Sequence, residues 1–461
     1  MPLTHPMGDT PKVSLTSTDI VGRIERVPFS RFHLKARLII GAATFFDGFD
    51  ALAIAYVLPV LIRMWRLSPV EIGNLISIGF VGQLVGALFF GWLAERRGRM
   101  LSLQLSVALF SVCSFCAAFS WNYTVLFLFR TLQGLGLGGE VPIAGAYINE
   151  ISKARGRGRF VMLYEMVFSI GLVAAAVLGS VIVPTLGWRA MFFIGAVPAV
   201  LVGAMRWMLP ESPRWLASQG RLEEADRIVA GIEREASRGG TIALPPVVLV
   251  PSVASQRMRV QELFQGIYRR RTLVVWVIWF TAYFATNGVQ TWLPSLYTKV
   301  FGLPLRESLR YGLVTQAFGL VSLLACALLI DRTGRKRWFV GGFLLGAFFM
   351  LGLWTLGATS AIQVLVLGTC AYASFNSVGT AQYLYTPEIY PTRMRALATS
   401  VGSAWLRVAS ALAPAAVGLV VARASLAAAF LLLGVVLLAG GLITGLFGIE
   451  TKGRPLEEIS P

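Results

Sequence analysis

Six ionisable side chains interrupt apolar stretches that are otherwise long enough to cross a lipid bilayer. They are Asp47, Asp50, Arg130, Glu140, Glu165 and Arg407. A charged side chain at bilayer depth costs at least about 2.5 kcal/mol, so each one is a candidate for function until a structural role is found. Carboxylates can carry protons, and a guanidinium can hold a carboxylate through two parallel hydrogen bonds. These residue types therefore permit proton exchange and the binding of a small anion.

Arg407 lies deep in the apolar stretch 397–420. In a cavity with aromatic walls its guanidinium suits a small planar carboxylic acid. The alternative is a salt bridge to one of the four buried acids, and both interpretations hold if substrate displaces an internal partner. The sequence therefore makes Arg407 the first candidate for substrate binding.

Two other apolar stretches, 272–297 and 361–386, supply candidate cavity walls. The candidates are Tyr283, Asn287, Gln290, Trp292, Asn376, Gln382, Tyr383 and Tyr385. Tyr283, Asn287 and Gln290 lie at positions i, i+4 and i+7, which form one stripe on a helix. Trp292 and Tyr385 are equally compatible with a belt of aromatic residues at the membrane surface.

The acids are candidates for proton coupling. Asp47 and Asp50 are about one helical turn apart and should project from one face, where two close carboxylates favour an exchangeable proton. A charge relay with Arg130, or capping of a helix break near Gly48, is the alternative. For both Glu140 and Glu165, proton coupling and structural pairing are equally compatible with the sequence. We therefore assign the proton-coupling role to these four acids together with Arg130.

Twelve apolar stretches must position these side chains. They are residues 37–62, 73–94, 100–119, 122–148, 160–184, 190–209, 272–297, 311–330, 338–357, 361–386, 397–420 and 425–448. Each is about the 20 residues that a membrane helix requires. In 461 residues, 56% are hydrophobic and 14% charged, with a net charge of +18. This composition excludes a disordered chain and counts against a soluble nucleic-acid-binding protein.

The basic residues predict the orientation. Most of the 41 Lys and Arg residues lie in the N-tail, the even-numbered loops and the C-tail. By the positive-inside rule both termini should be cytoplasmic, and the first span should act as its own insertion signal. The predicted domains are an N-tail 1–36, a six-helix half 37–209, a cytoplasmic linker with short helices 210–271, a second six-helix half 272–448 and a C-tail 449–461.

Three segments recur at a nearly constant separation. Residues 95–99 match 331–335, Glu150 matches Glu388, and Glu211 matches Glu450. Two halves of the same orientation should therefore be related by a pseudo-twofold axis along the membrane normal. Charged residues of the repeated segments are candidates for gating at the cytoplasmic surface, where each acid would pair with arginines of neighbouring helices. They are Glu95, Arg96, Arg99, Arg155, Arg157, Asp331, Arg332, Arg335, Glu388, Arg393 and Arg395.

The repeated segments resemble known signatures. Residues 91–99, Arg130 with the glycines that follow it, and residues 210–216 are similar to motifs of the major facilitator superfamily. Residues 138–142, 385–393 and Glu165 resemble the bacterial niacin transporter group and its relatives among organic ion transporters and synaptic vesicle glycoprotein 2 proteins. Residues 46–50 resemble the aromatic acid:proton symporters. Residues 287–292 lack the paired glutamines of sugar porters.

The resemblance implies an all-α membrane protein of twelve transmembrane helices that works by alternating access. It implies proton-coupled import of a small organic acid such as nicotinate across the inner membrane by a monomer. An organic cation transporter, a sugar transporter or uniporter, and a non-transporting receptor are the alternatives. An enzyme is not expected, because the two histidines, His5 and His33, lie in the N-tail and no P-loop is present. The sequence predicts no metal, no cofactor and no nucleic-acid partner.

Overall fold

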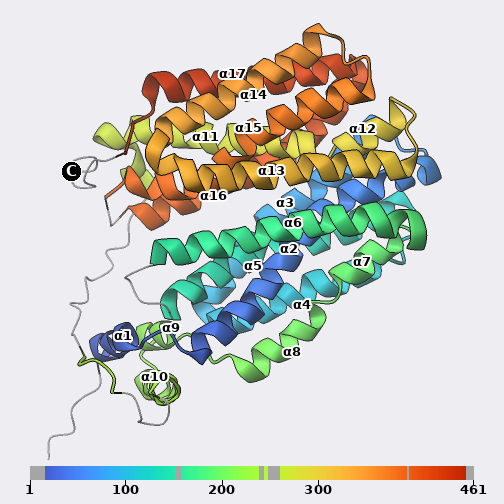
Figure 1. Cartoon of the computed structure of the whole chain (residues 1–461). Helices are drawn as coiled ribbons and strands as arrows, with labels where there is room; N and C mark the ends of the chain where they lie inside the picture. The colour runs from blue at the N-terminus through green and yellow to red at the C-terminus, as the bar shows by residue number, and fades with distance from the viewer. Residues whose placement is uncertain (1–15, 152–156, 238–242, 248–259, 392–393, 453–461) are drawn as a thin grey trace, which may run out of the picture.

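The computed structural model shows two bundles of long helices lying side by side (Figure 1). It describes residues 16–151, 157–237, 243–247, 260–391 and 394–452, and the side chains within them except those of 157–165, 260 and 396. Every regular element in these ranges is a helix. The chain is therefore an all-α protein, as the sequence predicts.

The first bundle, here called the N half, begins with a helix of 35 residues. Its helices are α2 (Arg31–Trp65), α3 (Pro69–Arg97), α4 (Arg99–Ala117), α5 (Tyr123–Ile151), α6 (Arg157–Leu186), α7 (Arg189–Gly195) and α8 (Ala199–Met208). The second bundle, the C half, repeats this order. Its helices are α11 (Gly266–Gln290), α12 (Leu293–Lys299), α13 (Leu305–Thr333), α14 (Arg335–Thr355), α15 (Ala361–Glu388), α16 (Arg395–Arg423) and α17 (Leu426–Phe447).

In the part of the chain that the structure describes, eleven helical segments are long and apolar enough to cross a membrane. The fourth predicted span, 122–148, corresponds to α5, which falls outside these eleven. Its 29 residues are nevertheless sufficient, because a helix rises about 1.5 Å per residue. Five glycines and two buried charges reduce its hydropathy, and it packs between α3 and α4. The protein is thus a multi-pass membrane protein in which α5 takes the fourth position.

Two predicted spans are interrupted rather than continuous. The sixth, 190–209, consists of α7 and α8 with a turn at 196–198 between them. Pro198 has no backbone N–H, so it cannot continue the helical hydrogen-bonding pattern of α7. The seventh, 272–297, consists of α11 and α12, which separate at Thr291 and Trp292 just before Pro294. Hydropathy detects both spans but cannot locate these breaks.

Both bundles have their helix ends at the same two levels. We call the level that holds the start of α2, the α3–α4 turn and the α13–α14 turn the tail end, and the opposite level the far end. At the far end Lys299 donates a hydrogen bond to the carbonyl oxygen of Leu67 across the two halves at 2.9 Å. There α3 and α16 also approach closely, since a Cβ on Gly73 would lie 2.6 Å from the carbonyl oxygen of Pro414. Glycine at this position lets the two backbones meet.

The tail end carries a small helical assembly on the N half. It contains α1 (Ser17–Arg26), α9 (Pro213–Ser218) and α10 (Leu222–Ala236), while η1 (Val260–Phe264) precedes the C half (Figure 1). One of the short helices predicted for the linker 210–271 is α10, which buries Ala225, Val229 and Ile232. The helix α1 was not anticipated. Its side chain Arg23 contacts Asp226 and also Glu233, the latter at 2.7 Å, so ion pairs fix α1 to α10.

Candidate functional site

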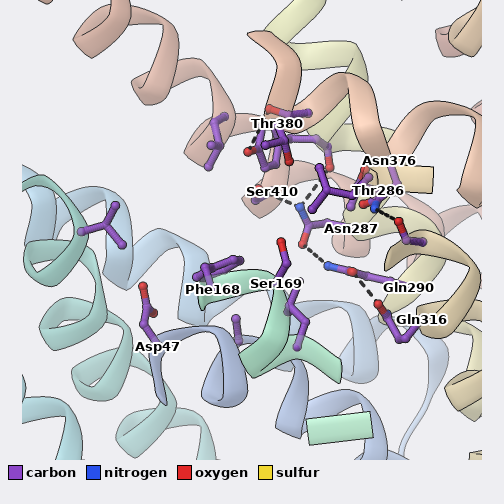
Figure 2. A pocket seen from close by; sticks show the side chains of 18 of the residues that line it. Asp47, Phe168, Ser169, Thr286, Asn287, Gln290, Gln316, Asn376, Thr380 and Ser410 are labelled. Atoms are coloured by element: carbon purple, nitrogen blue, oxygen red, sulfur yellow. Dashed lines mark hydrogen bonds between the residues drawn. The ribbon is translucent and has the colours of Figure 1, made fainter. Parts of the chain in front are cut away.

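A cavity lies between the two halves at the middle of the bundle (Figure 2). Its walls come from α2, α3, α5 and α6 of the N half and from α11, α13, α15 and α16 of the C half. The cavity has a volume of about 150 Å³, whereas one water requires only about 10–15 Å³. The cavity therefore has room for a small organic molecule.

Arg407 of α16 lines this cavity and is 9% exposed. Its Nη1 donates a hydrogen bond to the carbonyl oxygen of Ser403, one turn earlier on the same helix, at 3.1 Å. It forms no ion pair with any acid whose side chain the structure describes, so the salt bridge considered as its alternative role is not found among these residues. Its guanidinium interacts electrostatically with Tyr383, Asp47 and Tyr283.

Asp47 lines the same cavity from α2 in the N half and is 4% exposed. Figure 2 shows it on the opposite wall from the C-half residues Asn287 and Ser410. Arg407 and Asp47 therefore place one positive and one negative group on facing walls of one cavity. A site of this kind can bind an anion at the guanidinium while a proton occupies the carboxyl group.

Aromatic rings flank Arg407. Tyr283 and Tyr383 line the cavity, and Phe168 lines it from the N half. Trp279 supports both tyrosines from behind: its ring stacks on Tyr283 with 6.2 Å between centroids and meets Tyr383 edge-on at 4.7 Å. Its Nε1 donates a hydrogen bond to Thr386 at 3.0 Å. These contacts fix the tyrosine rings, so the cavity presents rigid faces to a planar molecule.

A cluster of amides and hydroxyls forms the far-end wall of the cavity. Gln290 donates a hydrogen bond to Oδ1 of Asn287 at 3.3 Å, and Asn287 donates to Oγ of Ser410 at 2.9 Å. The hydroxyl of Tyr372 lies 3.0 Å from Oε1 of Gln290 and 3.1 Å from Oε1 of Gln316. Figure 2 shows Asn287, Gln290 and Gln316 joined in one hydrogen-bonded row. Four helices, α11, α13, α15 and α16, thus meet in this cluster.

Asp50 does not share the cavity with Asp47. It is fully buried inside the N half, where its neighbours are Arg130 and Gln133 of α5. Arg130 is also buried and donates a hydrogen bond to Oε1 of Gln133 at 2.6 Å. The sequence predicts that both acids project from one face, but a separation of three residues rotates them by about 300° and leaves room for different neighbours. This places Asp50 beside Arg130, which is the charge relay considered as the alternative.

Glu140 lies directly behind the cavity wall. It is fully buried on α5 and accepts a hydrogen bond from Thr44 at 2.8 Å, and Thr44 itself lines the cavity. The side chain of Glu165 lies outside the described residues. Among the predicted proton-coupling residues, Asp47 therefore lines the cavity, and Glu140 is separated from it by the side chain of Thr44. Asp50 and Arg130 form a separate buried group.

Three of the candidate substrate-binding residues are not brought to the cavity. Trp292 donates a hydrogen bond from Nε1 to the carbonyl oxygen of Pro414, because the α11–α12 break turns its ring towards α16. Gln382 is buried in α15 and donates to the carbonyl oxygen of Gly379. Tyr385 exchanges hydrogen bonds with the backbone of Ile449 at the tail end. Tyr283, Asn287, Gln290, Asn376 and Arg407 do line it.

The predicted gating residues of the N half form a chain of contacts at the tail end. Arg99 pairs with Glu95 at 2.9 Å and with Glu150, at the end of α5, at 3.1 Å. The side chain of Glu211 accepts hydrogen bonds from the backbone N–H groups of Arg99 and Met100. Burial raises the pKa of Glu211, although these N–H groups and that of Ser212 oppose the effect.

The C half repeats these contacts. Arg335 pairs with Asp331 at 2.8 Å and with Glu388 at 3.0 Å, and its backbone N–H donates to Glu450 at 2.9 Å. The turn residues Gly98 and Gly334 both have positive φ, +105° and +95°. A Cβ on Gly98 would lie 2.2 Å from Oε2 of Glu211. The pseudo-symmetry inferred from sequence therefore extends to single hydrogen bonds.

The acids of the two turns pair with arginines at the start of the adjoining helix. Glu95 at the end of α3 pairs with Arg99 of α4, and Asp331 of α13 pairs with Arg335 of α14. Arg395 donates to the carbonyl oxygen of Tyr390. Arg96 lies over the ring of Trp92, and the carbonyl oxygen of Arg332 accepts from Lys452. Arg155 and Arg393, and the side chain of Arg157, lie outside the described residues.

Several cavity residues were missed by the sequence reasoning. Gln316, Tyr372 and Ser410 belong to the amide cluster, and Phe168 and Ser169 line the N-half wall. A signal for two of them was present, since Gln316 is a lone amide in an apolar span and Tyr372 lies one turn before Asn376. Within the described ranges no group of three or more His, Cys, Asp and Glu side chains could hold a metal ion.

Comparison with known proteins gives consistent matches over nearly the whole chain. Residues 38–461 match the family model described as Sugar (and other) transporter. The niacin transporter NiaP of Acinetobacter baylyi is 34% identical over 446 residues, covering 96% of this chain and 99% of that protein. Organic cation/carnitine transporter 7 of Arabidopsis thaliana is 29% identical over 481 residues, covering 93% and 94%. Among solved structures, the xylose transporter XylE from E. coli, in a partially occluded inward open conformation, superposes with a TM-score of 0.71 at 21% identity, covering 92% of this chain and 100% of that one.

Proposed function

This chain belongs to the Sugar (and other) transporter family, and from that premise we propose that it carries a small aromatic carboxylate, most simply nicotinate, across the cell membrane. The observation that carries this proposal is Arg407, a buried guanidinium in the central cavity between two tyrosine rings. The similarity to a niacin transporter along 96% of the chain supports it.

Arg407 suits a carboxylate for two physical reasons. A planar guanidinium binds a carboxylate through two parallel N–H···O bonds, and such charge-assisted bonds are about twice as strong as neutral ones. The low polarity around a buried site also reduces the competition from water. Tyr283 and Tyr383 then offer flat faces on which an aromatic ring can lie.

Transport would proceed by alternating access, with the two halves tilting about the cavity. Import would be driven by protons, and the carriers would be Asp47 in the cavity and Asp50 beside Arg130. An acid that alternates between protonated and ionised forms changes the charge balance of the site and can link substrate release to proton release. The protein would act as a monomer in the inner membrane, with both termini in the cytoplasm.

An organic cation is the second candidate, because Asp47 also lines the cavity and one relative is an organic cation/carnitine transporter. A cation would bind at the carboxylate and be repelled by Arg407. The two candidates therefore differ in which of these two residues is required for binding. A receptor that binds without transporting is separated from both by a flux measurement, and we do not assign an enzymatic reaction to the site.

The test is uptake of radiolabelled nicotinate into liposomes that contain the purified protein. We expect uptake above that of empty liposomes, with acceleration when the outside is made acidic and collapse with a protonophore. Competition by excess benzoate, an acid, or excess choline, a quaternary ammonium without a carboxylate, then distinguishes an acid from a cation. Binding of nicotinate without uptake would support the receptor, and inhibition by choline alone would replace the acid with the cation.

A further inference from the structure

We infer that Gln290, Gln316 and Tyr372 form a second recognition point, which binds a hydrogen-bonding atom on the substrate's ring at the end away from the carboxylate. The inference rests on the proposed function. It narrows the substrate class from aromatic carboxylates in general to those that carry such an atom meta to the carboxylate, as a pyridine-3-carboxylate does.

The cluster and Arg407 lie at two levels of the same cavity. Arg407 interacts electrostatically with Tyr283, and Gln290 follows Tyr283 by seven residues on α11. Seven residues of helix rise about 10 Å, and the direction is from the tail end towards the far end. Both glutamines and Tyr372 line the cavity at this second level. The cavity therefore has polar groups at two levels, with the tyrosine rings beside Arg407 and the amides towards the far end.

A pyridine carboxylate fits between these levels. In a pyridine-3-carboxylate the farther carboxylate oxygen lies about 5 Å from the ring nitrogen, and a hydrogen bond of about 3 Å at each end extends the total to about 11 Å. This is close to the rise of about 10 Å along α11 between Tyr283 and Gln290. A molecule bound at Arg407 would thus present its ring nitrogen to the amides.

The hydrogen bonds within the cluster do not satisfy every donor and acceptor of its side chains. The hydroxyl of Tyr372 is close to two carboxamide oxygens, those of Gln290 and Gln316, but it has a single hydrogen to donate. Each glutamine has two N–H hydrogens, and each is recorded donating one hydrogen bond, at 3.3 Å from Gln290 and 3.4 Å from Gln316. One N–H group of each glutamine and a carboxamide oxygen therefore remain available to a ligand that enters the cavity.

This arrangement favours a ligand with a matching polar atom. A buried polar group that loses water without gaining a partner costs about 1–3 kcal/mol, so a ring with a bare C–H at this point is disfavoured. Sites built to hydrogen-bond a substrate group discriminate strongly against analogues that lack it. The cluster would therefore reduce the affinity for benzoate relative to nicotinate, although both can bind Arg407.

The two recognition points are held in one rigid frame. Asn287 connects the cluster to α16, because it accepts from Gln290 and donates to Ser410, one turn after Arg407. On the other side Thr315, next to Gln316 on α13, bonds to Thr369 on α15 at 2.9 Å. Movement of the amides relative to Arg407 would break these bonds. The separation between the two points is therefore a fixed length that a ligand must match.

The test compares three acids on the purified full-length protein by isothermal calorimetry. Nicotinate carries its ring nitrogen meta to the carboxylate, picolinate carries it ortho to the carboxylate, and benzoate has none. We expect nicotinate to bind at least about tenfold more tightly than the other two, the equivalent of about 1.4 kcal/mol. In Tyr372→Phe and in Gln290→Leu we expect nicotinate affinity to fall to that of benzoate, while benzoate binding stays within about twofold.

The control is Gln104→Leu, which removes a buried glutamine of α4 that does not line the cavity. It should leave the ranking of the three acids intact. Equal affinities for nicotinate and benzoate in the unmodified protein would overturn the inference and leave the proposed function standing. Absence of binding by all three acids would instead overturn the proposed function. Because the first comparison needs no variant, misfolding of a variant cannot obscure it.

Discussion

Arg335 on α14 forms an ion pair with Glu388 at the end of α15, with 3.0 Å between Nη2 and Oε1. Arg99 makes the equivalent pair with Glu150 at 3.1 Å in the N half. Each pair joins the turn after one long helix to the end of another within the same half. The tail ends of the two halves are thus stabilised separately by matching contacts.

The first prediction concerns this pair. Glu388→Gln should reduce the rate of nicotinate uptake about three- to fivefold, because loss of a mostly buried pair worth about 1 kcal/mol loosens the tail end of the C half, which has to move as one body when the halves tilt. Affinity measured in detergent should change less than twofold, since Glu388 does not line the cavity. Glu388→Asp, which keeps the negative charge opposite Arg335, should retain most of the rate. A loss of affinity as large as the loss of rate would contradict a gating role.

The second prediction concerns the carboxylate site. Arg407→Ala should weaken nicotinate binding about 100-fold, because two charge-assisted hydrogen bonds are lost. Arg407→Lys retains the charge without the planar fork and should recover only part of the affinity. The control is Arg206→Ala, at an exposed position on α8. Undiminished binding of nicotinate by Arg407→Ala in calorimetry would refute the proposed role of this residue.

The third prediction concerns proton coupling. Asp50→Asn removes the charge beside Arg130 while leaving the cavity walls unchanged. We expect it to abolish accumulation of nicotinate against a gradient but to spare exchange of internal for external nicotinate, since exchange needs no net proton movement. Glu307→Gln, an exposed position at the start of α13, is the control. Full accumulation by Asp50→Asn would exclude Asp50 as a proton carrier.

The sequence predicted the helical fold, the repeat and part of the cavity's C-half wall. Hydropathy and repeated motifs depend on local sequence, and the stripe of Tyr283, Asn287 and Gln290 follows from helical spacing alone. Contacts between helices could not be predicted in this way. The separation of Asp47 from Asp50, the position of Trp292 after a helix break, and the meeting of Gln316 with Tyr372 all depend on how the helices rotate against one another.

The fourth prediction concerns pH and the attachment of α1. Burial would raise the pKa of Glu233, but hydrogen bonds from Arg23 and Arg26 outweigh this and hold it below its usual range. A lowered folded-state pKa means that the ionised group stabilises the fold above about pH 4.5, and that this contribution is lost as the pH falls through the lowered value. Acidification from pH 7 to pH 4 should therefore lower the melting temperature more in the unmodified protein than in Glu233→Gln.

The melting curves need a matched control for this comparison. Glu223→Gln, in the first turn of α10 and exposed, should respond to acid as the unmodified protein does. At pH 7 the Glu233→Gln substitution itself should cost about 1 kcal/mol, because it weakens contacts with two arginines. An identical response to acid in all three proteins would show that this carboxylate does not contribute to the pH dependence.

The fifth prediction concerns the α3–α4 turn. Gly98→Ala should destabilise the protein by about 2 kcal/mol, because φ is +105° and the new Cβ would lie 2.2 Å from Oε2 of Glu211. Gly91→Ala is the control, since a Cβ there meets nothing within 4 Å and alanine favours the helix. Thermal unfolding should therefore give opposite signs for the two substitutions. Equal effects would argue against strain at Gly98.

The attachment of α10 to the N half has a practical consequence. Since α10 packs on α1, α2 and α9 and is fixed by ion pairs from Arg23 and Arg26, it should move with the N half as one body. A spin label on its exposed face, paired with one on the tail-end turn of α14, would measure the tilt between the halves without altering the cavity. The same helix offers a rigid epitope for an antibody fragment in electron cryomicroscopy.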